Sequence, residues 1–375
     1  MRNKVVVAGH ACLDITPIFP RNIQASAIGD ILKPGKLVTM NGVDIHTGGA
    51  VSNTGLAMKL LGADVTLAAK VGDDDFGRII LDSYRKYGAD KGVIVDRHGK
   101  TSYSVVIAAP GIDRVFLHDP GCNDTFSFED VTKIDFSDTA LFHFGYPPIM
   151  KRIYENEGRE LVEAMKYVKQ QHIATSLDMA SVDENSAAGE ADWHSILANV
   201  LPYVDFFVPS IEETCWMLDR DRYRQWKQRA GNKDISLCID VDNDIKPIAD
   251  ECLKLGAKVV MLKCGAPGIY YRTGNRTQIQ GLSEDLGSRL DGWNDREGFE
   301  KSYLPDRVLS GTGAGDTTIA AFLTAVMKGY SFDMCVHLAA AEGASCITEY
   351  DALSGLKQLS DLQNRIEAGW AKHDE

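Results

Sequence analysis

The sequence lacks the cysteine spacing of a zinc or redox site and any apolar run of membrane-spanning length. Its eight cysteines are scattered over 375 residues without a CxxC pair, so free thiols in a reducing cytoplasm are expected rather than disulfides or metal ligands. The N-terminal stretch MRNKVVVAGHACLDITP starts basic and then apolar. Its apolar run is short and Asp14 interrupts it, so we interpret it as a buried strand and not as a signal peptide. The expected protein is cytoplasmic, with no membrane partner.

Positive charge is also scarce. The chain has 40 lysines and arginines against 53 acids, a formal net charge of -13, which argues against nucleic acid as a partner. A small anionic substrate stays open, because one pocket can be positive on an acidic protein. The 44% hydrophobic content is ordinary for a globular chain, and we found no internal repeat. The length allows one large domain with an appendage, or two domains.

Strand-like and helix-like stretches alternate along most of the chain. Residues 4–8 (KVVVA) are a β-branched run, as expected for a strand buried in a parallel sheet. The stretch SNTGLAMKLLG is helical in pattern, with Ser52 or Asn53 as the expected N-cap and Gly62 as its end. Further strands are expected at 64–71, 140–144, 174–178, 206–208 and 259–263, and helices at 160–171 and 248–255. The alternation predicts an α/β fold with a parallel sheet covered on both faces.

Two segments interrupt this alternation and predict a small β lid. They contain short strand-like runs and turns without helices, as in YSVVIAAPGIDRVFL, where two strands are expected to join at Pro110-Gly111. We therefore expect one domain over 1–375, with lid segments at about 16–47 and 100–125. An exposed edge of a lid sheet is suited to strand pairing, so a homodimer through the lid is a further hypothesis. The stretches 219–246 and 275–306 are interpreted as surface insertions of unassigned role.

The stretch SGTGAGDTTIAAFL (310–323) carries the clearest chemical signal. Glycines alternate at Gly311, Gly313 and Gly315, Asp316 follows, and an apolar helical pattern then runs to Gly329. A glycine loop that opens into a helix N-terminus can bind an anion through backbone amides, without a side-chain cation. GxxxxGK[ST] is absent, and GxGxG is not GxGxxG, so neither a P-loop nor a dinucleotide fingerprint is predicted.

An acid beside an anion-binding loop suits phosphoryl transfer to an alcohol. That reaction needs a base for the hydroxyl proton and donors for the charge on the transferring phosphoryl group. The alternative for Asp316 is a favourable helix-start acid or an N-cap, which is the commoner role for a lone carboxylate there.

These residues resemble the ribokinase-like (PfkB) family of carbohydrate kinases. GTGAGD matches the core of the family's C-terminal signature, and GGAVSNTGLAMKLLGADVTLAAKVGDDDFG (48–77) is similar to its N-terminal one. VVVAGHACLDITP resembles its first strand, which ends in an Asp. The resemblance covers nearly the whole chain. It implies a ribokinase-like three-layer sandwich with a mainly parallel central sheet plus a small β-sheet lid, and the use of ATP and Mg²⁺.

The resemblance also implies roles for single residues. Asp316 would deprotonate the sugar hydroxyl, and the amides of Gly313, Ala314 and Gly315 would form the anion hole. The sugar hydroxyls would be held by Asp14, Gly48, Gly49 and Asn53. Each has a structural alternative: a loop-capping acid for Asp14, a plain turn for the glycine pair and a helix cap for Asn53. In the lid, Arg114 and Asn123 would contact the substrate, or Arg114 would face solvent. His143 is expected to be packed, and Asp178 is a secondary polar candidate.

The nucleotide side is implied by two further stretches. VDFFVPSIEETCWML resembles an Asn-x-x-Glu motif in which Glu213 would act on magnesium through water, but Ser210 stands where Asn is usual. VVMLKCGAPGIYY resembles the strand and turn beside the nucleotide. The nucleotide-binding candidates are Ser210, Lys263, Gly265, Gly268 and Gly311. Ser310 stands where many relatives carry an acid for potassium, so the resemblance does not support a monovalent-cation site.

The predicted function is an ATP-dependent kinase that phosphorylates a hydroxyl of a small sugar or sugar derivative. A nucleoside kinase of the same fold is the alternative among enzymes. A non-catalytic sugar- or nucleotide-binding sensor is the alternative among other classes; the intact GAGD argues against it, while the departures at Ser210 and Ser310 leave it open. The sequence leaves the identity of the sugar and of its hydroxyl open.

Overall fold

The main body is a three-layer α/β sandwich, as the alternation predicted. The computed structural model describes residues 2–20, 28–110, 114–283 and 285–373. Its eight-stranded sheet has the order β14-β13-β12-β11-β10-β9-β1-β4. The strands are β1 (Lys4–Gly9), β4 (Asp64–Ala68), β9 (Thr139–Gly145), β10 (Ala174–Asp178), β11 (Phe206–Phe207), β12 (Val259–Lys263), β13 (Gly268–Thr273) and β14 (Glu297–Lys301). All neighbours from β4 to β12 pair in parallel, and β13 is antiparallel to both of its neighbours.

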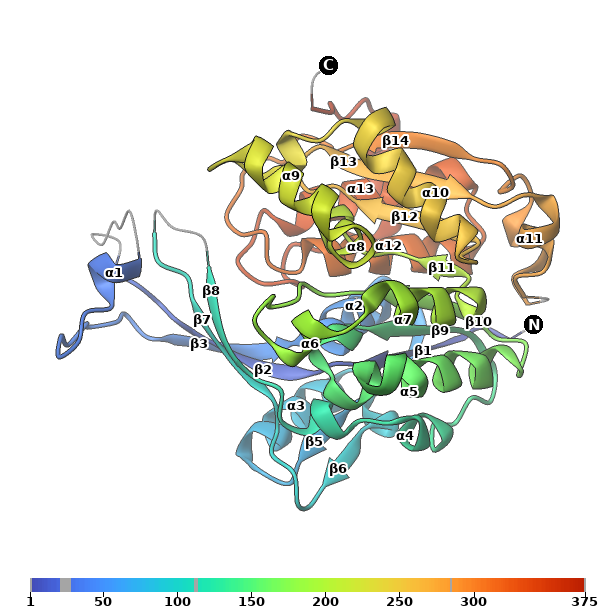
Figure 1. Cartoon of the computed structure of the whole chain (residues 1–375). Coiled ribbons are helices and arrows are strands. Elements are labelled where there is room, and N and C mark those ends of the chain that lie inside the picture. Colours follow the sequence, from blue (N-terminus) through green and yellow to red (C-terminus); the bar gives the residue numbers. More distant parts are fainter. Residues whose placement is uncertain (1, 21–27, 111–113, 284, 374–375) are drawn as a thin grey trace.

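Helices cover both faces of this sheet (Figure 1). One apolar core layer includes α2 (Gly49–Leu60), α3 (Asp75–Lys86), α12 (Ala314–Lys328), α13 (Phe332–Cys346) and α14 (Leu359–Glu367). The other includes α4 (Phe128–Thr132), α5 (Lys151–Lys169), α7 (Trp193–Val200), α8 (Ile211–Leu218), α9 (Arg220–Ala230) and α10 (Lys246–Lys254). Short elements α1 (Ile28–Ile31), α6 (Ala187–Glu190), α11 (Arg276–Gln280), β5 (Lys70–Gly72) and β6 (Ile94–Asp96) complete the chain. The parallel strands thus end at one edge of the sheet, where loops from several strands meet.

Two expectations about the main body were wrong. The stretch 275–306 is not merely a surface insertion, because its residues 297–301 form β14 and pair with β13 at the edge of the main sheet. Helix α2 begins at Gly49 and not after Ser52 or Asn53, since Gly48 is its N-cap residue. Ser52 and Asn53 lie inside the helix, and their side chains bond to Tyr84 and Asp316 instead of capping it.

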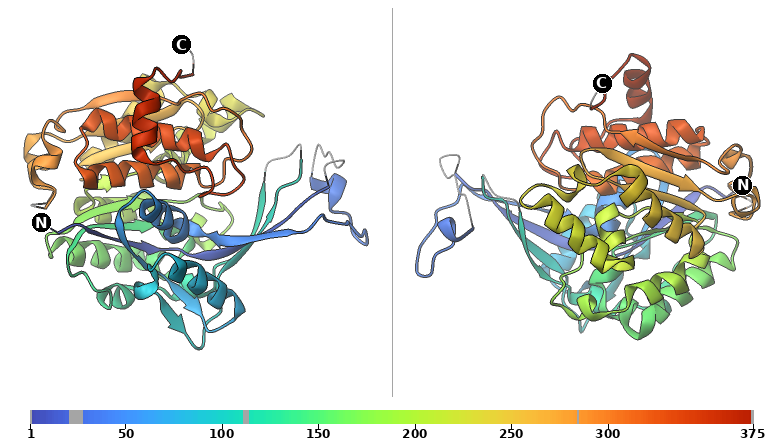
Figure 2. Two further views of the ribbon diagram at one scale, coloured as in Figure 1. Left: turned by 180° about the vertical axis from the view of Figure 1, so that it is seen from behind. Right: turned by 45° about the horizontal axis from the view of Figure 1, so that its top comes forward.

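A separate four-stranded sheet forms the lid. Its order is β3-β2-β7-β8, with β2 (Cys12–Pro17), β3 (Val43–Gly48), β7 (Tyr103–Ile107) and β8 (Val115–Asp119). Figures 1 and 2 show this sheet projecting from one side of the body, with α1 near its far end. The two predicted segments supply it, although β2 already starts at Cys12. The turn expected at Pro110-Gly111 falls partly on Gly111, which lies outside the described residues.

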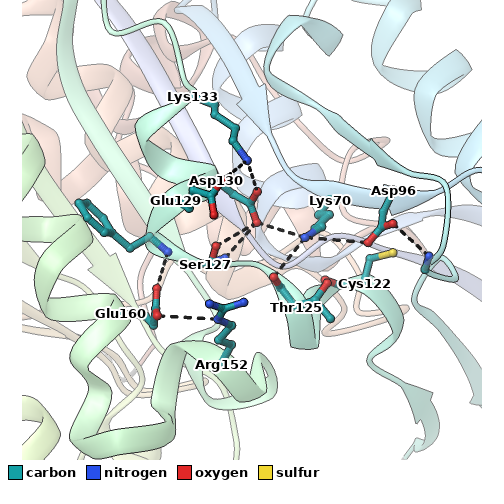
Figure 3. Close-up of polar contacts among 12 residues, drawn as sticks. Lys70, Asp96, Cys122, Thr125, Ser127, Glu129, Asp130, Lys133, Arg152 and Glu160 are labelled. Carbon is teal, nitrogen blue, oxygen red and sulfur yellow. Dashed lines mark hydrogen bonds and ion pairs between the residues drawn. The ribbon is translucent and has the colours of Figure 1, made fainter.

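The chain that returns from the lid is anchored by a cluster of polar contacts (Figure 3). The ammonium of Lys70 on β5 lies 3.2 Å from the Thr125 carbonyl oxygen and 3.3 Å from Asp130 Oδ2. Asp130 also accepts from the backbone N–H and the hydroxyl of Ser127. Glu160 on α5 accepts a 2.8 Å bond from the backbone N–H of Phe128. The base of the lid is therefore fixed to the body, while its far end projects away from it.

Candidate active site

Asp316 lies in the first turn of α12, where the loop 310–315 meets the end of the sheet. Its residue is only 4 % exposed. Burial raises the pKa of the Asp316 carboxyl above its ordinary value, and the nearby Lys263 ammonium and three hydrogen-bond donors oppose that shift. A carboxylate with a raised pKa in a protected position is suited to accepting a proton.

The three donors hold the carboxylate in one orientation. Asn53 Nδ2 donates to Oδ2 and Thr54 Oγ1 donates to Oδ1, each over 3.1 Å. The Tyr146 hydroxyl lies 2.8 Å from both oxygens. Asn53 and Thr54 come from α2, while Tyr146 follows β9, so segments far apart in sequence meet at Asp316. An N-cap role for Asp316 is not seen, because Gly313 is the N-cap of α12.

The loop before Asp316 requires glycine at Gly313. Its φ is +74°, in the left-handed region. A Cβ there would also lie 2.2 Å from the Cβ of Ala352. Regular backbone bonding of α12 begins with Thr317, whose N–H donates to the Gly313 carbonyl over 2.9 Å. Of the amides that precede it, that of Ala314 makes a long bond of 3.4 Å to the Gly311 carbonyl; as at any helix N-terminus, first-turn amides can serve an anion.

A lysine from another strand lies beside this first turn. Lys263 ends β12, and its Nζ lies 2.8 Å from Oδ1 of Asp178, which ends β10. Burial raises the pKa of Asp178 to about 7, with the Lys263 ammonium opposing the shift. A Cβ on Gly315 would lie 3.5–3.6 Å from the last atoms of the Lys263 side chain. The loop has no cation of its own, but the fold brings one to it.

Ser210 and Glu213 form a capping box at the start of α8. Ser210 Oγ accepts from the Glu213 N–H over 3.2 Å, and Glu213 Oε2 accepts from the Ser210 N–H over 3.0 Å. Ser210 thus preserves the helix cap at the position where the motif usually has Asn. After burial, the Glu213 charge also contributes to the raised pKa of Asp178.

The turn between β12 and β13 also contains two of the predicted glycines. Gly265 and Gly268 both have positive φ, +62° and +142°. A Cβ on Gly268 would lie 2.0 Å from the Glu300 carbonyl oxygen, so glycine is required there by packing. This turn directly follows Lys263.

On the lid side, Asp14 lies within β2 and not at the end of β1, which corrects the expected position. A Cβ on Gly48 would lie 2.1 Å from Asp14 Oδ2. The Asp14 carboxylate therefore fits beside the start of α2 only because residue 48 is a glycine. Gly49, with φ of +82°, packs against His10. Burial raises the pKa of Asp14 above its ordinary value. Asp14, Gly48, Gly49 and Asn53 are thus brought together near Asp316.

The two lid candidates differ. Arg114 precedes β8 and bonds through Nη1 to Thr312 Oγ1, so it connects the lid with the glycine loop. Asn123 is fully buried, and its amide donates to the Ala11 carbonyl and accepts from the Ala11 N–H. These contacts tie Asn123 to the chain at the start of β2, and its contact with substrate stays a prediction. His143 is packed as predicted, with Nδ1 2.9 Å from Ser176 Oγ.

Sequence reasoning missed Tyr146, Thr54, His10 and His118. Tyr146 has a left-handed backbone, with φ of +69°, which aims its ring from the end of β9 toward Asp316. The surrounding Gly-Tyr-Pro-Pro run indicates a tight turn but not the direction of the side chain. His10 and His118 meet only through the fold, with their Nε2 atoms 3.4 Å apart.

The comparisons with known proteins agree with this arrangement. The sequence profile of the pfkB family of carbohydrate kinases matches residues 2–359. The chain belongs to this family. It is 24% identical to an "Uncharacterized sugar kinase" of Archaeoglobus fulgidus over 82% of this chain and 100% of the relative. It is 23% identical to the 2-dehydro-3-deoxygluconokinase of Bacillus subtilis over 87% and 88% of the two chains.

A solved structure confirms the fold of this PfkB-family protein. Arabidopsis thaliana ribokinase complexed with ribose and ATP superimposes with a TM-score of 0.69 at 18% identity, covering 97% of this chain and 98% of that one. The predicted ribokinase-like sandwich with a lid is therefore confirmed, and the protein is a carbohydrate kinase, a phosphotransferase with an alcohol as acceptor. Kinases of this family use ATP. Among the described residues, no helix combines the length and apolar character needed to cross a membrane.

Proposed function

We propose that this carbohydrate kinase transfers the γ-phosphoryl group of ATP to a hydroxyl of a small sugar or sugar derivative, with Asp316 as the base. The observation that carries the proposal is the buried Asp316 carboxylate, fixed by three donors beside the first-turn amides of α12. Its raised pKa makes it a competent acceptor for the hydroxyl proton. The acceptor would be held by Asp14, Gly48, Gly49 and Asn53, on the side of the lid.

The transferring group would meet positive potential from two sources. The amides of Gly313, Ala314 and Gly315 lie at the positive end of α12, and the Lys263 ammonium lies beside them. As charge develops on the phosphoryl oxygens, these fixed donors stabilise it without reorganising. The loop would thus stabilise the transferring phosphoryl group, and Asp316 would accept the proton of the acceptor hydroxyl.

The nucleotide would lie against the loops that follow β11 and β12. The candidates are Ser210, Lys263, Gly265, Gly268 and Gly311. Mg²⁺ is usually held by one or two carboxylates together with phosphates, and the Glu213 carboxylate in the first turn of α8 is a ligand of that kind. When bound, the metal would neutralise phosphate charge, and Glu213 would act on it through water. Ser310 bonds to Thr312 over 2.9 Å and brings no carboxylate, so no potassium dependence is proposed.

Acceptor-dependent ADP release tests the proposal. Purified protein with Mg·ATP should release ADP when one acceptor from a panel of sugars, sugar acids, sugar phosphates and nucleosides is added. If nucleosides are the only acceptors in the panel that cause ADP release, the protein is a nucleoside kinase. Thermal stabilisation by a sugar without ADP release from any acceptor would show a binding protein that lacks the reaction.

Replacing Tyr146 by Phe should move the pH dependence of the kinase. The Tyr146 hydroxyl lies 2.8 Å from both oxygens of Asp316, donates its one proton to the carboxylate and so lowers the pKa of Asp316. Without that donor the pKa of Asp316 rises further, and the carboxylate becomes protonated at a higher pH. The acidic limb of kcat/KM against pH should therefore shift to higher pH in Y146F.

The matched control for this variant is Tyr84→Phe, which also removes a buried phenol, here one whose hydroxyl bonds to Ser52 and makes no bond to Asp316. It should leave the acidic limb in place. An unshifted limb in Y146F would show that a group other than Asp316 controls the profile.

We further propose that the lid pairs with the lid of a second copy. On the sheet face opposite Asp14, four apolar side chains are 38–55 % exposed, and within the described ranges the outer edges of β3 and β8 pair with no further strand. They are Val43, Ile45, Val115 and Leu117. A self-complementary apolar face of this kind is suited to a two-fold contact. Sedimentation should show a dimer for the native chain and a monomer for Ile45→Glu/Leu117→Glu; a monomeric native chain would contradict the proposal.

A further inference from the structure

Among the residues that the structure describes, Glu342 on α13 is a buried acid with no ion-pair partner. Its residue is 0 % exposed, and Oε1 of its carboxyl group accepts a 3.0 Å bond from the backbone N–H of Lys357. The other oxygen, Oε2, has no hydrogen-bond partner within the described ranges. Other buried acids lie within ion-pair distance of a cation: Asp130 with Lys70, Asp178 with Lys263, Asp205 with Lys169, Asp244 with Arg229 and Glu300 with Lys372. A buried carboxyl group without such a partner is far more costly when charged than when neutral.

The bond from Lys357 joins α13 to the segment 347–358, which runs from the end of α13 to the start of α14. This segment folds back onto α13, because a Cβ on Gly355 would lie 2.7 Å from the Ser345 carbonyl oxygen. Glu342 therefore attaches the far end of the segment to the helix that it leaves.

The same segment packs against the glycine loop. At the start of the loop, the N–H of Leu309 donates to the Ile347 carbonyl over 2.8 Å. A Cβ on Gly313 would lie 2.2 Å from the Cβ of Ala352, so Ala352 packs directly on the N-cap of α12. The position of the first-turn amides of α12 therefore depends on where the segment 347–358 lies.

Helix α13 also contacts the start of α12 beside Glu342 (Figure 1). A Cβ on Gly343, the next residue, would lie 2.6 Å from Thr318 Oγ1. That hydroxyl donates to the Ala314 carbonyl over 2.7 Å. Glu342 is thus connected to the first turn of α12 by two routes, through its own helix and through the segment 347–358.

The surroundings of Glu342 favour its uncharged form. Burial raises the pKa of Glu342 to about 8, and the N–H and ammonium of Lys357 oppose the shift. Of the described residues, the charged groups on the elements packed against α13 are not among the causes of this shift, including Asp316 of α12, Arg365 of α14, Arg272 of β13, Glu300 of β14 and Asp351 of the segment. The thiol of Cys346, on the same helix, stays protonated because burial raises its pKa to about 12. Glu342 is therefore uncharged at neutral pH and becomes a buried charge in alkaline solution.

We propose that Glu342 is a positioning residue for the phosphoryl transfer: its uncharged carboxyl group keeps the segment 347–358 against the glycine loop, and its ionisation releases the segment. The inference rests on the proposed role of the first-turn amides and goes beyond it, because it adds a pH-sensitive contact outside the site. A charged Glu342 would be hydrated when Lys357 and its neighbours move away, and that movement would displace Ala352 from Gly313. The kinase should therefore lose its anion hole reversibly in alkaline solution.

Glu342→Gln tests the titration without any substrate. Glutamine keeps an acceptor for the Lys357 N–H and stays neutral at every pH. Because folding raises the pKa of Glu342, the folded native chain keeps a proton that the unfolded chain loses, so native stability falls as the pH rises from 4.5 to about 8 and then levels off. Between pH 5 and pH 8.5, the melting temperature of E342Q should therefore rise relative to the native value by at least about 3 °C.

Glu300→Gln is the matched control, because it makes the same substitution at another buried glutamate. Burial acts against the charge of Glu300, but His337 and Lys372 hold the pKa of this carboxyl group below its ordinary value. E300Q should therefore melt below the native chain, by the same margin at pH 7 and at pH 8.5. A melting-temperature difference between E342Q and the native chain that stays constant from pH 5 to pH 8.5 would overturn the inference.

Turnover connects Glu342 to the loop. Above the pKa of Glu342 the uncharged fraction falls ten-fold per pH unit, so the native kcat should fall about ten-fold between pH 7 and pH 9 and recover when the pH is returned. The kcat of E342Q should change by less than about three-fold over this range. An alkaline limb in E342Q equal to the native one would overturn the positioning role.

Nucleotide binding separates this inference from the proposed function. If no acceptor causes ADP release, the proposed function fails, and the Kd of Mg·ATP then decides whether Glu342 positions the loop. The native Kd should rise between pH 7 and pH 9, while that of E342Q stays constant. A native Kd that is equal at the two pH values would overturn the inference as well.

Discussion

Asp316→Asn should lower kcat by about 10²–10⁴-fold, the range typical of a lost general base. The amide cannot take the proton of the acceptor hydroxyl, although it nearly matches the carboxylate in size. Thr54 and Tyr146 can still bond to it, while Asn53 must turn its amide to present oxygen instead of nitrogen. We therefore expect a loss of stability of only about 1–2 kcal/mol. Binding of ATP should be retained, and steady-state ADP release together with nucleotide titration measures both effects.

A first-turn acid in the next helix provides the control. Asp333 stands at the start of α13, as Asp316 does at the start of α12, but it is exposed and pairs with Arg296 at the surface. If Asp316 served only the helix dipole, D316N and D333N would have similar, small effects on stability and none on kcat. A kcat of D316N within three-fold of the native value would therefore reject Asp316 as the base.

The elements that the sequence predicted best are those with strong local signals. Helix α12 begins and ends as the pattern predicts. The residues that flank it, Gly313 and Gly329, both take the left-handed conformation, which does not continue a right-handed helix. Strands β10 and β12 match the expected 174–178 and 259–263, because short strand-like stretches alternate with helical patterns in this part of the chain. The family resemblance then supplied the order of these elements.

The contacts that create the site could not be predicted in this way. Asn53 has the local pattern of a helix cap, but the +82° φ of Gly49 starts the helix earlier and frees Asn53 to reach Asp316, 263 residues away. Lys263 reaches the first turn of α12 only because β12 ends beside it. Tyr146 depends on a strained backbone that most residues avoid. Each of these is decided by tertiary packing, of which a single sequence carries no local trace.

Gly313→Ala should abolish most of the activity by displacing the anion hole that precedes Asp316 in the first turn of α12. An alanine with φ of +74° costs about 1–2 kcal/mol, and its Cβ would lie 2.2 Å from the Cβ of Ala352. The backbone must shift to relieve that overlap, and the first-turn amides shift with it. Loss of one such donor typically lowers kcat by about 10²–10³-fold. The measurement is kcat with saturating acceptor and ATP, beside the melting temperature.

Two variants separate misplaced amides from general backbone strain. Gly231 also has a positive φ, +61°, but a Cβ there meets nothing within 4 Å, so Gly231→Ala should cost stability without lowering kcat. Ala352→Gly removes the atom that Gly313→Ala overlaps, so the double variant should recover part of the lost kcat while the strain of the left-handed alanine stays. Native turnover in G313A, or no recovery in the double variant, would show that the position of these amides does not limit the reaction. If the double variant recovers kcat but not stability, the loss of kcat in G313A comes from the displaced loop amides, because the strain that lowers stability is still present.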